Sequence, residues 1–246
     1  DWSVTGVQTC ALPIWFQLQA LSGIPHEQQY FETLVSLARE LGFEFCAYGL
    51  RLPFPCSRPR VVMFNNYPVA WQTRYRERDY LTVDPTVQHG MRSLLPVIWS
   101  DDLVTSAREF WDDACSFGLR FGWAQSSRDV NGVGGMLTLA RSSEPLSAAE
   151  LQHKGFQMAW LTQLAHLGMS QRLIPRLTPE SQARLSNREV AVLRWTAEGK
   201  TSAEISIILK ISERTVNFHI GNAILKLRVT NKTAAAVRAA ALGLLS

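Results

Sequence analysis

The sequence predicts an α+β protein: an N-terminal α/β/α sandwich with a mainly antiparallel sheet, followed by a C-terminal all-α domain of four helices. The chain has 246 residues, which is enough for two separately packed domains. Apolar residues make up 46% of it and charged residues 19%, a composition typical of globular proteins. Strand-like runs alternate with helical patterns up to about residue 167, whereas the last sixty or so residues carry helical patterns alone.

The N-terminal part shows the expected elements in order. Residues 27–41 place apolar side chains at helical spacing, and Gly42 follows as a stop signal. Short runs rich in aromatic and β-branched residues predict strands over 45–51, 60–65, 97–100, 122–128 and 135–141. The pair Asn131-Gly132 favours a tight turn between the last two strands. Further helices are predicted after Pro68, from Asp84-Pro85, over 104–117 and over 147–167.

Loss of periodicity marks the domain boundary. Residues 171–184 contain two prolines and predict a linker between an N-terminal domain of residues 15–170 and a C-terminal domain of residues 185–246. Residues 1–14 have no basic start and only a brief apolar patch, so they fail as a signal peptide. They resemble a translated sequencing adapter, and we therefore expect a non-native leader there.

Cysteine usage and hydropathy exclude several classes of protein. The four cysteines show no C-x-x-C pair and no clustering with histidine, which indicates neither a metal site nor a disulfide framework. No apolar stretch reaches the eighteen or so residues that cross a bilayer. We therefore expect a cytoplasmic protein with reduced thiols and no membrane partner.

The charge of the chain is unevenly placed. From Arg184 to the end there are ten Lys or Arg against four acids, a net charge of +6, whereas the preceding residues carry −2. A compact basic domain suits a polyanion, because neutralised phosphates release condensed counterions. A basic face that serves only solubility is the alternative at this point.

Local start signals divide the basic tail into four short helices. They are N-cap residues, in two cases with the Glu three residues later that completes a capping box. The starts are Ser186 with Glu189, Thr201 with Glu204, Ser212, and Thr230. Gly199 ends the first helix. Together these signals predict four short helices within about sixty residues.

The third of these helices has two different faces. One carries Val216, Ile220 and Leu227 and is predicted to be buried, while the opposite face carries amides and cations. Such a face can enter a DNA major groove, where Asn reads adenine and Arg or Lys meets guanine or phosphate. Periodicity alone equally allows a solvated polar face.

The run L-S-N-R-E-V-A-V-L-R-W-T-A-E-G-K-T-S-A-E-I, followed by I-S-E-R-T-V-N-F-H-I and V-T-N-K, resembles the DNA-binding domain of LuxR-family regulators. The resemblance implies that residues 212–227 form the recognition helix. It implies that Asn217, Phe218, Gly221 and Asn222 face bases, and that Arg214, His219 and Lys226 lie near the backbone. By itself, His219 is more typical of a half-buried helix residue than of a DNA contact. Arg228 departs from the family, which often has a small or polar residue there.

The N-terminal part contains an aromatic cluster. Tyr67, Trp71 and Tyr75 follow at i, i+4 and i+8 on one helix face, and Trp99 and Trp111 come later. Spacing alone is typical of a hydrophobic core. Likewise, Asp84 directly before a proline is typical of a helix cap.

The strings Y-P-x-A-W-x-x-x-Y, D-Y-L-x-x-D-P-T-V and W-S resemble the autoinducer-binding domain of quorum-sensing members of the same family. The resemblance implies a buried N-acyl-homoserine lactone as ligand, with no other cofactor. Trp71 would donate to the lactone carbonyl, Asp84 would accept from the ligand amide, and Tyr67 and Thr138 would donate to the amide carbonyl. Tyr75, Trp99 and Trp111 would form the wall around the lactone.

These inferences together predict a lactone-sensing transcription regulator. The resemblance implies a homodimer on a near-palindromic double-stranded operator and RNA polymerase as a further partner. A ligand-independent regulator of the same fold is the main alternative. A response regulator lacks support because the body has no phosphoacceptor acidic cluster. No G-x-S-x-G or H-x-H-x-D motif indicates an enzyme.

Overall fold

The protein is represented by a computed structural model that describes residues 21, 23–55, 59–130, 132–178 and 184–245. The expected leader at 1–14 lies outside the described residues. The chain forms two compact units. Of the described residues, the first unit takes in those up to Arg51, Val61–Arg128 and Gly134–Arg172, and the second takes in those within 52–60, 129–133 and 173–245.

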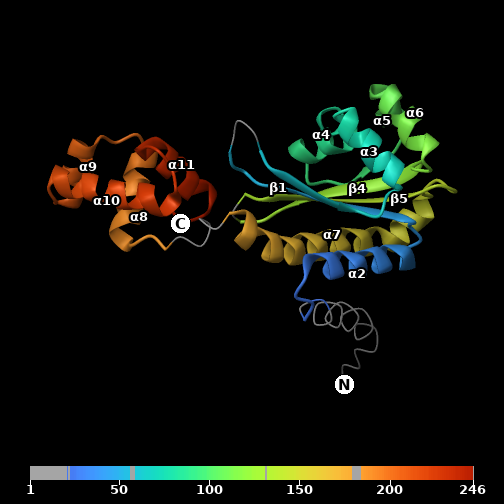
Figure 1. Cartoon of the computed structure of the whole chain (residues 1–246), viewed down its shortest axis with the longest axis horizontal. Coiled ribbons are helices and arrows are strands. Elements are labelled where there is room, and N and C mark those ends of the chain that lie inside the picture. Colours follow the sequence, from blue (N-terminus) through green and yellow to red (C-terminus); the bar gives the residue numbers. More distant parts are fainter. Residues whose placement is uncertain (1–20, 22, 56–58, 131, 179–183, 246) are drawn as a thin grey trace, which may run out of the picture. The chain divides into compact units, whose positions relative to one another are not determined.

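A five-stranded antiparallel sheet forms the middle of the first unit (Figure 1). The strand order is β2-β1-β5-β4-β3, so the last long strand lies next to the first. The strands are β1 (Phe45–Arg51), β2 (Val61–Asn65), β3 (Val97–Ile98), β4 (Phe121–Arg128) and β5 (Gly134–Arg141). All five follow the predicted strands closely, although β3 ends two residues early.

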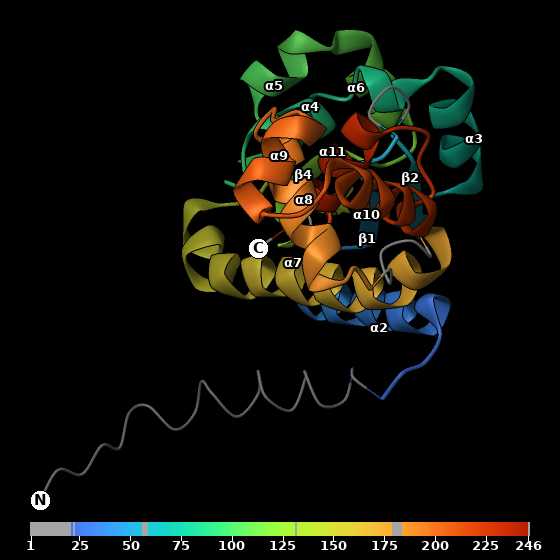
Figure 2. The ribbon, with the colours of Figure 1, turned by 90° about the vertical axis from the view of Figure 1, so that its left-hand side faces the viewer.

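Helices cover both faces of this sheet, which confirms the predicted α/β/α sandwich. One face is covered by α2 (Glu27–Glu40) and α7 (Ala148–Leu177), which run side by side in Figures 1 and 2. The Tyr30 hydroxyl in α2 donates to the Leu164 carbonyl oxygen in α7 at 2.8 Å. The opposite face is covered by α3 (Val69–Glu77), the 3₁₀ turn η1 (Tyr80–Thr82), α4 (Pro85–Arg92), α5 (Asp101–Ser106) and α6 (Arg108–Ser116).

Two predicted helices on that face are interrupted. The helix after Pro68 ends at Glu77, because Asp79 adopts a left-handed φ of 49° and the chain continues into η1. The predicted helix over 104–117 is divided at Ala107, whose φ of −149° is extended. The resulting corner allows the Trp111 indole N–H to donate to the Leu103 carbonyl oxygen at 3.0 Å.

Helix α7 continues ten residues beyond the predicted end at 167, so residues 171–177 of the predicted linker are helical. Tertiary contacts favour this extension over the helix-breaking effect of Pro175. Arg172 donates to the Gly168 carbonyl oxygen at 2.7 Å and to the Ile24 carbonyl oxygen at 2.9 Å, and it stacks on the Tyr30 ring. Residues 179–183 lie outside the described part of the chain.

The second unit contains the four predicted C-terminal helices: α8 (Asn187–Ala197), α9 (Ser202–Leu209), α10 (Glu213–Leu227) and α11 (Lys232–Ala241). Both predicted capping boxes are present, and Ser212 caps α10 as expected. The fourth cap is Asn231 rather than Thr230, because the Asn231 Oδ1 accepts from the Ala234 N–H at 2.8 Å. Buried aliphatic side chains from all four helices form its core.

We expect Arg228→Gly to stabilise the second unit by about 1 kcal/mol. Arg228 follows α10 with a left-handed φ of 52°, a conformation that crowds any Cβ. Urea denaturation of the protein, monitored by the unfolding of α8–α11, measures the change in the free energy of unfolding. Arg228→Ala is the control, since it removes the charge and retains the Cβ. An equal gain from alanine would show that backbone strain is not the cause.

Candidate ligand site and nucleic-acid interface

The predicted aromatic residues meet in one cluster on the face of the sheet covered by α3–α6. Its buried members are Trp71, Tyr80, Phe110, Trp111, Ala114, Leu119 and Ala140, and Tyr67, Tyr75 and Trp99 pack against them. The rings of Trp99 and Trp111 are 4.8 Å apart, and those of Trp71 and Tyr75 are 5.7 Å apart. Five predicted site residues from three separate segments are therefore brought together here.

Asp84 is a buried helix cap at the edge of this cluster, with 7% of its surface exposed. Its Oδ1 accepts from the Thr86 N–H at 2.8 Å, the Thr86 hydroxyl at 2.6 Å and the Val87 N–H at 3.4 Å. Its Oδ2 accepts from the Tyr75 hydroxyl at 2.9 Å. One carboxylate oxygen is thus saturated, while the other has a single donor among the described residues.

Burial raises the pKa of Asp84 above its usual value, although the hydrogen bonds from Thr86 and Tyr75 act in the opposite direction. Burial, reinforced by the nearby charge of Asp84, also raises the pKa of Tyr67 and the pKa of Tyr75. Both phenols therefore remain protonated, and the Tyr75 hydroxyl donates to the Asp84 carboxylate.

Gly122 supports Trp99, a role that no local sequence pattern indicates. A Cβ on Gly122 would lie 2.5 Å from the Trp99 ring, so only glycine lets the indole lie against β4. The Trp99 N–H is buried and makes no hydrogen bond within the described residues. The Trp111 indole N–H, in contrast, donates to the Leu103 carbonyl oxygen. Gly122 in β4 and Trp99 in the segment after β3 are far apart in the sequence, and they pack together only in the folded domain.

Thr138 completes the predicted set from the sheet. It is buried in β5 opposite Ala124 of β4, which lies two residues beyond Gly122 and therefore on the same face. Trp99 packs over that face. Thr138 therefore lies on the side of the sheet that carries the aromatic cluster.

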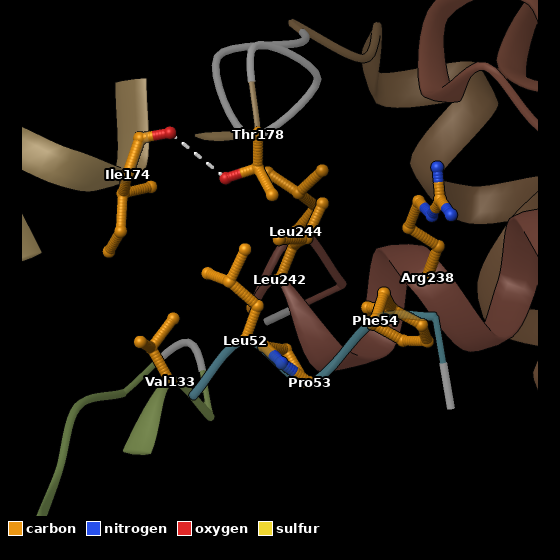
Figure 3. Close-up of a pocket in the computed structure, with 10 residues that line it drawn as sticks. Leu52, Pro53, Phe54, Val133, Ile174, Thr178, Arg238, Leu242 and Leu244 are labelled. Atoms are coloured by element: carbon orange, nitrogen blue, oxygen red, sulfur yellow. Dashed lines mark hydrogen bonds between the residues drawn. The ribbon is translucent and has the colours of Figure 1, made fainter. Parts of the chain in front are cut away.

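Other kinds of site receive less support. A pocket of about 250 Å³ in the second unit is lined mostly by apolar side chains, including Leu52, Phe54 and Leu242, and contains no predicted site residue (Figure 3). Within the described ranges, no three His, Cys, Asp or Glu side chains are placed to hold a metal ion. None of the described helices is both long and apolar enough to span a membrane.

In the second unit, α10 presents the predicted DNA-facing residues. Arg214, Asn217 and Phe218 are exposed, and Phe218 is 63% exposed. The Asn217 Oδ1 accepts from the Ser202 hydroxyl at 2.8 Å, which ties the start of α9 to α10. His219, Gly221 and Asn222 are partly buried along the helix.

Lys226 has a partner that the sequence interpretation did not anticipate. Its ammonium lies 2.8 and 3.0 Å from the two carboxylate oxygens of Glu189, which is only 3% exposed. Glu189 Oε2 also accepts from the Ser186 N–H in the α8 capping box. Desolvation raises the pKa of Glu189, but the hydrogen bonds from Lys226 and the Ser186 N–H outweigh it, and the pKa is lowered.

Comparison with known proteins assigns a family to both predicted domains. Residues 26–169 match the autoinducer binding domain, and residues 183–239 match the luxR family of bacterial regulatory proteins. The transcriptional activator protein AnoR of Acinetobacter nosocomialis is 49% identical over 230 residues, which cover 93% of this chain and 97% of AnoR.

Solved structures agree with this assignment. SdiA in complex with octanoyl-rac-glycerol is 34% identical with a TM-score of 0.83, and the match covers 95% of this chain and 96% of SdiA. Solved SdiA chains include the Escherichia coli protein. The N-acylhomoserine lactone dependent factor CepR2 from Burkholderia cenocepacia is 34% identical with a TM-score of 0.61, over 66% of this chain and 96% of CepR2.

The two matched domains lie in the order that the sequence predicts, and relatives of this chain are regulators rather than enzymes. The chain belongs to the luxR family of bacterial regulatory proteins, as a member with an autoinducer-binding domain, and it is a DNA-binding transcription regulator of quorum sensing.

Proposed function

We propose that the signal is an N-acyl-homoserine lactone held in the aromatic cluster, with Asp84 accepting a hydrogen bond from the ligand amide. The Asp84–Tyr75 pair carries this proposal: Oδ2 has one donor at 2.9 Å and retains a lone pair for a second. A buried carboxylate is costly unless it is well hydrogen-bonded, so a ligand N–H at this position is strongly favoured.

The other predicted residues take complementary roles in this proposal. Trp71, 2% exposed, donates its indole N–H to the lactone carbonyl, and Tyr67 and Thr138 donate to the amide carbonyl. Tyr75 already donates to Asp84, so it orients that carboxylate as well as lining the site. Trp99 and Trp111 pack beside the lactone. CepR2, whose solved structure is described as lactone dependent, supports this ligand class.

Ligand specificity provides the test. The full chain is expressed with N-octanoyl-homoserine lactone, with octanoyl-glycerol, or with no addition, and its soluble yield and melting temperature are compared. We expect the lactone to give the largest increase in both, because binding to the native state alone adds stability. Equal yield and melting in all three preparations would contradict the sensor role. Equal stabilisation by octanoyl-glycerol would show that the lactone head group is not recognised.

We further propose that the regulator acts in the cytoplasm as a homodimer that binds a near-palindromic operator and contacts RNA polymerase. The symmetric geometry of helix-turn-helix dimers on half-sites supports the first part, and the activator names of relatives such as AnoR support the second. Sedimentation of the protein with a selected operator tests the stoichiometry. A single protomer per operator would contradict the dimer.

Asn217→Ala is expected to weaken operator binding at least tenfold, because an asparagine amide pairs with adenine through two hydrogen bonds. Lactone binding should not change. Fluorescence anisotropy with an operator selected from random duplexes measures the first quantity, and calorimetry measures the second. Ser202→Ala is the matched control: it removes the 2.8 Å contact to Asn217 and leaves the amide in place. Equal losses in both variants would indicate that Asn217 only holds α9 against α10.

A further inference from the structure

The exposed face of α10 carries two large apolar side chains. Phe218 is 63% exposed and Leu225 is 77% exposed, and their separation of seven residues places them on one face of the helix. Gly221 lies between them on the same face. A single exposed apolar residue is common on protein surfaces and requires no partner. The glycine beside these residues provides a second observation.

Gly221 has no explanation within the described part of the chain. It lies in the middle of α10 without a positive φ, and a Cβ added there would meet nothing within 4 Å. Gly122 and Gly168 differ, because a Cβ on either would collide with an aromatic ring. Glycine in a helix interior disfavours folding about fivefold relative to alanine. An external surface that approaches the α10 backbone closely would account for it.

Duplex DNA fits this surface better than a protein does. The C-terminal residues from Arg184 carry a net charge of +6, and exposed Arg214 lies one turn before Phe218. The major groove displays one kind of apolar group, the 5-methyl of thymine. The N-terminal part of a recognition helix lies nearest the base edges, and Phe218 in the second turn of α10 is closer to that part than Leu225 in the last turn.

We propose that Phe218 contacts the 5-methyl group of a thymine in each operator half-site, and that Gly221 lets the α10 backbone approach the adjacent base edge. This inference rests on the proposed function of α10 as the recognition helix. It adds the identity of one recognised base and a reason for a glycine that internal packing does not require.

Replacing thymine by deoxyuridine removes only the methyl group and tests the first part. With the lactone-bound full chain and a selected operator, each thymine of both half-sites is replaced in turn. At one symmetric pair of positions we expect affinity to fall about fourfold per half-site, the effect of losing one buried methyl group. Phe218→Ala should abolish this difference, whereas Leu225→Ala should retain it. Equal binding of thymine and deoxyuridine at every position would overturn the proposal, as would an unchanged penalty in Phe218→Ala.

Gly221→Ala tests the second part through two effects of opposite sign. Added helix propensity should raise the melting temperature, while the new methyl group should weaken operator binding at least tenfold. Gly155→Ala is the control, because Gly155 lies in α7 and its added Cβ also meets nothing within 4 Å. That variant should bind the operator normally. Wild-type operator affinity in Gly221→Ala would overturn the close approach.

Asn217→Ala separates this inference from the function on which it rests. If Asn217→Ala and Phe218→Ala both weaken binding but deoxyuridine has no effect, α10 enters the groove and the methyl contact is wrong. If neither variant weakens binding, the placement of α10 itself is wrong. A Phe218→Ala protein that binds DNA normally but fails to support transcription would assign the side chain to a protein partner and overturn the proposal.

Discussion

Replacement of Asp84 by alanine is expected to weaken lactone binding about a hundredfold and to abolish the ligand-dependent increase in operator affinity. The change removes the acceptor for the ligand amide, and a hydrogen bond to a buried charged group contributes about 1.5–3 kcal/mol. It also leaves the Tyr75 hydroxyl and the Thr86 N–H without the acceptor they share. Calorimetry with the purified chain measures the loss.

An isosteric variant and a modified ligand separate the contact from folding. Asp84→Asn keeps Oδ1 for the α4 cap and replaces Oδ2 with an amide NH2 group, so the chain should fold while binding the lactone weakly. The ester analogue of the lactone lacks the amide N–H. We expect it to bind the wild type at least tenfold more weakly than the amide, and to bind Asp84→Ala as well as the amide does. A full ester penalty in Asp84→Ala would remove Asp84 from the head-group contacts.

The direction of the Asp84 pKa shift also fixes a pH dependence. Burial raises the pKa of Asp84 in the folded, ligand-free protein. Asp84 therefore stabilises that fold at pH values below its pKa in the unfolded chain. This stabilisation is lost as the pH rises through its pKa in the folded protein. Accepting the amide N–H requires the carboxylate. Lactone affinity should therefore fall as acid protonates Asp84, and a pH titration of binding should lose this component in Asp84→Asn.

Replacement of Glu189 by alanine is expected to destabilise the second unit by about 2–3 kcal/mol. Glu189 closes the α8 capping box by accepting from the Ser186 N–H, and it pairs with Lys226 of α10. Only 3% of its surface is exposed. Alanine removes both contacts and leaves a space. Hydrogen exchange of α8 and α10 amides, measured by mass spectrometry, should show the loss locally.

Lys226→Met is the matched control for Glu189. It removes the ion pair and keeps the apolar stem, but it leaves a buried carboxylate with only its capping contacts, so it should destabilise the unit by at least 1 kcal/mol. Folding lowers the pKa of Glu189. Glu189 therefore stabilises the domain at pH values above its pKa in the unfolded chain, and this stabilisation is lost as the pH falls through its pKa in the folded domain. Unchanged exchange in both variants would show that the pair does not stabilise the domain.

Local sequence patterns predicted most of the secondary structure. The capping boxes at Ser186 and Thr201 involve partners three residues apart, and the strand patterns of β1 and β4 depend on residues within a single segment. Interactions of such short range leave a readable signal in any window of the chain. The order of the two domains and the fold class followed from these patterns.

Features that depend on interactions between distant segments could not be predicted from the sequence. The left-handed Asp79, the break at Ala107 and the extension of α7 past Gly168 all run against the periodicity of their own segments. The extension of α7 is accompanied by a contact from a distant segment, that of Arg172 with the Ile24 carbonyl oxygen. Packing energy from such contacts exceeds the small local preference for continuing or ending a helix.

The sequence by itself therefore determined the two domains, the capped four-helix tail and the aromatic residues of the proposed ligand site. Only the tertiary structure decided which oxygen of Asp84 retains a lone pair, and that Glu189 binds Lys226. It also distinguished Gly122, which internal packing requires, from Gly221, which it does not. Local hydrogen bonds depend on neighbours in the chain, whereas burial and close approach depend on the position of every element around them.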